Sequence, residues 1–233
     1  MKTAFVLLCS VSLVTISLAG EIVVQKIQGE VSVRQGVTEV WNRIAAGDVL
    51  RPDDTMKTGV KGSAVLLVRG ESGEAKRITL PQEVIVDLSD IRDLTQEELM
   101  LKLTMEKVRS SSYQWKNNEL QIPRAAVVHG GNVTSPEGPA QNDPAVGVFR
   151  LNGTRVLFEN GFYSTCALKS MEVFRLYPAL GRKFENRLLV AEALGKARLR
   201  GEALNEYGSL LTLDGLSPDQ QDLVKARMAE LKR

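Results

Sequence analysis

Few residues of this chain have both the type and the spacing that catalysis requires. The chain contains one histidine, His129, so any Ser-His-Asp or Cys-His arrangement would have to include it. Asp87, Asp90 and Asp93 recur at every third position, which does not match the ligand spacing of a calcium loop, and we interpret them as a solvated acidic edge. We therefore expect a protein that is not an enzyme and has no catalytic residues, no metal ligands and no cofactor.

The first nineteen residues are typical of a secretory signal peptide. A positively charged residue precedes an apolar run over 4–19, and Ser17 and Ala19 place small side chains before a cut near Ala19. The run is shorter than the roughly 20 residues that span a membrane, so we expect no membrane span after cleavage. The predicted location is periplasmic or secreted, and Cys166 remains as a single, buried thiol because Cys9 leaves with the leader.

The composition is that of an ordinary globular protein. Hydrophobic residues make up 43% of the 233 residues and charged residues 25%, which suits one large or two small domains. The formal net charge is only +2, so the chain has no general attraction for nucleic acid. We expect no nucleic-acid partner.

The first half has the period of β-strands. Val31 and Val33 alternate with polar residues, and the apolar run over 64–68 suits a strand that is buried on both faces. Glycines recur throughout 29–73, which favours tight turns and excludes a long helix. We predict a compact β domain over 20–134.

The motifs of this half resemble those of the periplasmic FecR-like domain, over about a third of the chain. They lie, in order, at 29–33, 47–50, 57–59 and 62–66. The resemblance implies a role in envelope signalling or in binding at the cell surface. The chain departs from the family pattern at 70–73, where the family tends to have an Asp-Gly-Ser turn, but the segment still predicts a hairpin.

One helix is predicted inside the β domain, near 95–109. Thr95 and Glu98 have the spacing of a capping box, and the run of serines at 110–112 ends the apolar pattern. We expect this helix to pack on the β domain and 125–128 to form a late strand.

A linker is predicted at 135–144, followed by a helical domain over 145–233. The linker is rich in Gly and Pro and has almost no apolar side chains. Directly after it, Asn152 and Gly153 form a strong hairpin signal, but Val148 and Phe158 also fit one face of a helix. We favour the helix.

This second half resembles tetratricopeptide repeats. The motif 161–163 with Ala167, Met171, Phe174 and Pro178 follows the second helix of a repeat, and a second copy with a shortened turn follows around 194–207. The resemblance implies stacked helical pairs that leave a concave groove.

Basic residues are concentrated between positions 175 and 200. Arg175, Arg182, Arg187 and Arg198 are candidates for a partner-binding groove that takes an envelope protein or an anionic envelope polymer. The alternative is a solvated helix face.

Together these patterns predict an α+β protein, with an N-terminal all-β FecR-like domain that carries one added helix, and then a C-terminal helical repeat-like domain. We expect a non-catalytic exported envelope protein that acts as a binding or scaffold module, with the helical half binding a protein partner. One alternative is a polysaccharide-binding or peptidoglycan-binding module, which would need Trp41, Tyr113 or Trp115 exposed for stacking. Another is an exported hydrolase with paired carboxylates.

Overall fold

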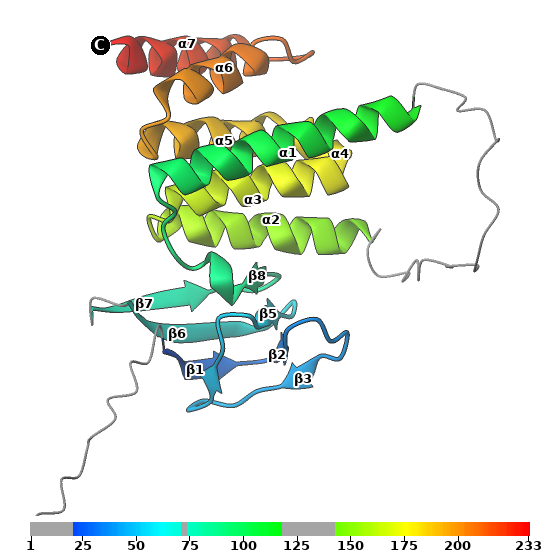
Figure 1. The fold of residues 1–233 in the computed structure, drawn as a ribbon, viewed down its shortest axis with the longest axis vertical. Helices are drawn as coiled ribbons and strands as arrows, with labels where there is room; N and C mark the ends of the chain where they lie inside the picture. Colours follow the sequence, from blue (N-terminus) through cyan, green and yellow to red (C-terminus); the bar gives the residue numbers. More distant parts are fainter. Residues whose placement is uncertain (1–20, 71–73, 118–142) are drawn as a thin grey trace, which may run out of the picture.

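The N-terminal part of the protein forms two four-stranded antiparallel sheets, and helices follow (Figure 1). The computed structural model describes residues 21–70, 74–117 and 143–233. One sheet has the strand order β4-β1-β6-β7 and the other β3-β2-β5-β8. The strands are β1 (Ile22–Gln28), β2 (Val31–Arg34), β3 (Asn42–Arg43), β4 (Val49–Leu50), β5 (Thr55–Thr58), β6 (Ser63–Arg69), β7 (Ala75–Leu80) and β8 (Ile85–Asp87).

The inner faces of the two sheets carry the apolar residues of each strand. Val24, Leu66 and Ile78 stand in register across β1, β6 and β7 and are almost completely buried. In the other sheet Val33 pairs with Met56, which is also buried. The alternation predicted for the first half therefore places one face of each sheet in a common core. The predicted hairpin is confirmed, because β6 and β7 pair from Ala64 opposite Leu80 to Arg69 opposite Ala75.

The helices stack in layers on one side of the sheets, with α6 and α7 farthest from the strands (Figure 1). They are α1 (Gln96–Asn117), α2 (Pro144–Glu159), α3 (Tyr163–Leu176), α4 (Pro178–Gly181), α5 (Phe184–Lys196), α6 (Arg200–Leu210) and α7 (Pro218–Lys232), with a short 3-10 turn, η1 (Leu88–Asp90), before α1. Ser217 and Gln220 form a reciprocal capping box at the start of α7. The predicted α+β class, with strands first and helices behind, is confirmed at this level.

Helix α1 lies against α3 (Figure 1), so the prediction that it packs on the β domain was wrong. The Glu106 carboxylate is buried, with only 5% of its side chain exposed, and it binds the guanidinium of Arg175 on α3. The N–H of Glu98 donates to the hydroxyl of Thr95, which confirms the predicted helix start. The helix continues past 109, because the hydroxyl of Ser110 donates to the carbonyl of Glu106 and is satisfied without leaving the helix.

Helix α2 joins the two halves of the protein directly. Gly153 lies so close to β8 that an added Cβ would stand 2.1 Å from the carbonyl oxygen of Ile85. The side-chain amide of Asn152 donates to the carbonyl of Glu83 over 2.9 Å. The choice of a helix for this segment is confirmed, and the Asn-Gly pair that resembles a hairpin turn is used for contact between helix and sheet.

The remaining predictions on local structure concern residues that the structure does not describe. The leader at 1–19, the late strand at 125–128 and His129 lie outside the described residues, as does most of the linker. Asp143 caps α2 and Pro144 is its first residue, so the helix begins at the last position of the predicted linker. Among the helices described, none is long and apolar enough to cross a bilayer.

Candidate functional site

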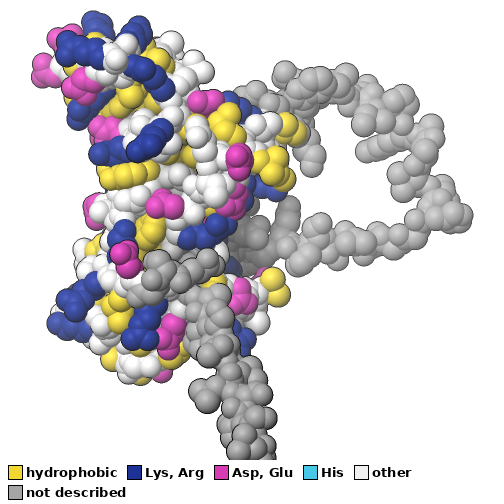
Figure 2. Space-filling view, turned by 60° about the vertical axis from the view of Figure 1, so that its left-hand side comes forward, with side chains coloured by type: hydrophobic (Ala, Val, Ile, Leu, Met, Phe, Trp, Pro, Cys, Tyr) yellow, Lys and Arg dark blue, Asp and Glu magenta, His cyan; other side chains and the backbone are white. Residues whose placement is uncertain are grey.

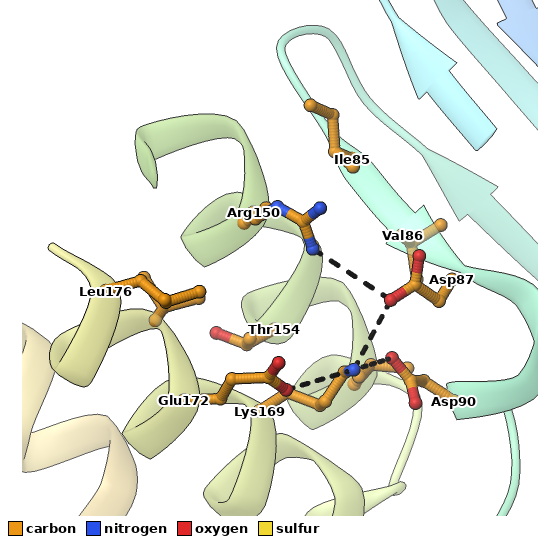
Figure 3. A pocket seen from close by; sticks show the side chains of 12 residues that line it. Ile85, Val86, Asp87, Asp90, Arg150, Thr154, Lys169, Glu172 and Leu176 are labelled. Carbon is orange, nitrogen blue, oxygen red and sulfur yellow. Dashed lines mark hydrogen bonds and ion pairs between the residues drawn. The ribbon is translucent and has the colours of Figure 1, made fainter. Parts of the chain in front are cut away.

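Charged residues gather where β8 meets α2 and α3 (Figure 3). The ammonium of Lys169 lies 3.3 Å from a carboxylate oxygen of Asp87, 3.2 Å from one of Asp90 and 3.2 Å from one of Glu172. Arg150 lies 4.0 Å from Asp87 on the other side. Asp87 and Asp90 thus contact Lys169, a pairing that the sequence analysis did not predict. The interpretation as a solvated edge was wrong for Asp87 and Asp90, because both side chains are largely buried against the helices. Asp93, the third member of the predicted edge, is exposed.

Burial and charge act in opposite directions on this cluster. Burial raises the pKa of Asp90 to about 6, and the nearby charge of Asp87 adds to the rise. The attraction of Lys169 lowers this pKa but does not offset the effect of burial. Burial also opposes ionisation of Asp87, but the hydrogen bond from Thr55 and the charges of Lys169 and Arg150 outweigh it and lower its pKa. For Lys169, burial is outweighed by the surrounding carboxylates, which raise its pKa.

This arrangement is suited to holding the sheet and the helices together. A protonated lysine that contacts three carboxylates is neither a nucleophile nor a base. The space beside it measures about 20 Å³, which is room for about one water molecule. Within the described ranges, no group of three or more histidine, cysteine, aspartate or glutamate side chains could hold a metal ion.

The four arginines singled out in the sequence do not come together. Arg175 is bound to Glu106 of α1 at 2.5 Å, and Arg187 is bound to Glu206 of α6 at 2.7 Å. Both therefore join helices within the protein. Arg182 and Arg198 are exposed at opposite ends of α5.

A groove is formed instead by α2, α5 and α7, with Tyr207 of α6 also in its lining. It consists of two adjoining hollows of about 240 and 380 Å³ that share Phe158 and Glu192. Figure 2 shows, over the helical part of the molecule, hydrophobic side chains lying between charged ones. The apolar members of the lining are half-buried, and they are Phe158, Leu188, Leu189 and Leu231.

Carboxylates outnumber the free cations of this groove. Glu159 and Glu185 are exposed and make no ion pair with the described residues, while Glu192 is paired with Arg227 at 3.6 Å. The guanidinium of Arg155 is occupied, because it donates to the side-chain oxygens of two asparagines. The ammonium of Lys196, an exposed side chain that makes no ion pair with the described residues, lies 5.9 Å from the ring centre of Phe158. The groove therefore presents apolar side chains beside two unpaired carboxylates and this one cation, where the sequence had suggested a basic surface.

Aromatic rings are the third kind of candidate. Trp41 is half-buried at the start of β3, with the guanidinium carbon of Arg34 5.5 Å and the ammonium of Lys57 5.7 Å from its ring centre. The side chains of Tyr113 and Trp115 lie outside the described ones.

Sequence reasoning missed the groove, although one signal for it was present. Glu185, Leu188, Leu189 and Glu192 follow the spacing of one helix face, and that face combines apolar with acidic residues. The partners of Lys169 had no comparable signal, since Asp87 lies 82 residues away in the chain.

No family model, no curated protein and no solved structure matches this chain.

Proposed function

We propose that this protein is an exported, non-catalytic scaffold of the cell envelope whose helical half binds a protein partner in the groove of α2, α5 and α7. The observation that carries the proposal is this groove, with its half-buried Phe158, Leu188 and Leu189. Partly exposed apolar side chains in a hollow are typical of interaction sites. The motifs that resemble FecR-like domains and tetratricopeptide repeats, and the leader-like segment at 1–19, support the same reading.

A protein segment suits this groove better than an anionic polymer does. Glu159 and Glu185 would repel a polyanion, and they make no ion pair with described residues that would offset their charge. The apolar lining instead favours a segment that inserts apolar side chains and carries basic residues beside them.

The non-catalytic part of the proposal has separate support. Two partly buried acids, Asp87 and Asp90, both contact the ammonium of Lys169, and the space beside them is only about 20 Å³. The exported-hydrolase alternative would need such a pair to face a substrate-sized space.

Site-directed photocrosslinking in cells tests the proposal. A photoreactive amino acid at Leu188 should give one discrete protein adduct, while the same group at Val60, which is 63% exposed in the sheet part, should not. Reversal of both free carboxylates, Glu159→Lys with Glu185→Lys, should reduce the adduct at least about fivefold without unfolding the protein, because both side chains are exposed.

The matched control reverses two charges outside the groove, Arg182→Glu with Arg198→Glu. If this control alone abolishes the adduct, the exposed arginines carry the binding and the proposed groove is wrong. Equal labelling from Leu188 and Val60, or adducts that contain only glycan, would also contradict the proposal.

A further inference from the structure

The outer face of the β3-β2-β5-β8 sheet is covered by helices over only one half. Two rows of residues cross this face, one through Arg43, Ser32, Lys57 and Ile85 and one through Arg34, Thr55 and Asp87. At the β8 end of these rows, α2 and α3 lie on the sheet, because Gly153 touches Ile85 and Lys169 binds Asp87. The β2 and β3 end is not covered by any described helix (Figure 1).

The uncovered half carries three cations. Arg34, Arg43 and Lys57 make no ion pair with any residue in the described ranges. Arg34 donates to the hydroxyl of Thr55 at 3.3 Å, but its Nε is shielded from solvent and has no acceptor among the described groups. A positive surface without internal counter-charges is free to bind an external anion.

Trp41 adds an aromatic surface to the same half. It precedes β3 by one residue, and continuation of the β2–β3 register places it beside Arg34, in agreement with the 5.5 Å from that guanidinium to its ring centre. Ser32 stands between Arg43 and Lys57 in its row, so the two cations are two strand spacings, about 10 Å, apart.

These groups together match a carboxylated sugar chain. Guanidinium binds a planar carboxylate through paired hydrogen bonds, and an indole ring provides an apolar surface against which the C–H face of a sugar ring can pack. A serine hydroxyl can exchange hydrogen bonds with sugar hydroxyls. Cations on neighbouring strands suit a polymer that carries its charges at regular intervals.

We propose that this uncovered half of the sheet binds a carboxylated polysaccharide through Trp41, Arg34, Arg43 and Lys57. The site lies at the opposite end of the molecule from α6 and α7 (Figure 1), and it goes beyond the protein-binding groove. A partner protein on the helices and an acidic glycan on the sheet could therefore be bound by one chain at the same time.

Titration of the purified protein with oligomers of polygalacturonate tests this site, with binding measured by calorimetry and by fluorescence. The chain has two tryptophans, so a Trp115→Phe background makes Trp41 the sole tryptophan, which can be excited selectively over the four tyrosines. Its emission should change on binding. Arg43→Gln with Lys57→Gln should weaken binding at least about tenfold, and Trp41→Ala about threefold to tenfold.

The matched control removes the same charge from the other sheet, by Lys26→Gln with Arg77→Gln, and should leave the affinity within about twofold. Absence of binding, or an equal loss in the control, overturns the proposal. Equally tight binding of single-stranded DNA or of polyglutamate also overturns it, because the site would then recognise a nucleic acid or an acidic peptide rather than a sugar.

Discussion

Replacement of Gly153 by alanine should separate α2 from β8. The new Cβ would stand 2.1 Å from the carbonyl oxygen of Ile85, while ordinary contacts begin at 3.4 Å. The helix must therefore move away by more than about 1 Å, because a backbone oxygen in a paired strand cannot rotate aside. This movement also strains the hydrogen bond from Asn152 to Glu83.

The expected change is a loss of about 2 kcal/mol in the free energy of unfolding. Overpacking of this kind costs about 1–3 kcal/mol, and the weakened hydrogen bond adds up to about 1 kcal/mol. Alanine is the better helix former, which returns up to about 1 kcal/mol. Steric exclusion thus outweighs propensity at position 153.

Gly208→Ala provides a control of the same chemistry. Gly208 lies within α6, and an added Cβ there would meet no atom within 4 Å. This variant should gain up to about 1 kcal/mol, so the two alanine variants should change stability in opposite directions. Urea unfolding followed by far-UV circular dichroism measures both. A Gly153→Ala protein as stable as the wild type would refute the close contact between helix and strand.

Three further predictions follow from buried charges and the buried thiol. Arg175→Gln removes the closer of the two cations beside the Glu106 carboxylate, which is 5% exposed, and should lower the free energy of unfolding by about 3 kcal/mol in urea titrations. Arg109 is 60% exposed and lies 3.9 Å from the same carboxylate, so Arg109→Gln should change the free energy of unfolding by less than about 0.5 kcal/mol. Equal effects of the two variants would contradict this difference. The pKa of folded Asp90, about 6, lies above the ordinary 3.8, so the folded state takes up this proton first and stability should rise as the pH falls from about 7 to about 5. Asp90→Asn should remove that rise, and an unaltered pH profile would rule out Asp90 as its source. Burial raises the pKa of Cys166 to about 12, so a thiol reagent at about pH 8 should label it only after unfolding, whereas rapid labelling of the native protein would show an accessible thiolate.

The contacts between the two halves bear on both proposed binding sites. Lys76 of β7 donates to the carbonyl of Asn160 and lies 4.2 Å from the ring centre of Phe162. Gly153 also packs against Ile85 of β8, and Lys169 binds Asp87. Together these contacts fix the sheets against the helices. We therefore expect a ligand on the sheet and a partner on the helices to be held in a defined relative position, as a scaffold requires.

Much of the local structure could be predicted from the sequence. The alternation at Val31 and Val33, the β6–β7 hairpin and the helix start at Thr95 were all predictable, because each depends on residues a few positions apart. The helix over 144–159 was predictable despite its Asn-Gly pair, since a glycine within a helix costs only about 1 kcal/mol.

Which helices and strands pack against one another, and which charges pair, depended on the tertiary structure. The apolar stripe of α1 fits a sheet or a helix equally well, and the buried pair of Glu106 with Arg175, 69 residues away, favours α3. In the same way Lys169 pairs with Asp87 and Asp90, and Arg187 binds Glu206 instead of lining a basic groove. Periodicity and caps act within a few residues, whereas burial of a charge requires a counter-charge that only the folded chain brings near.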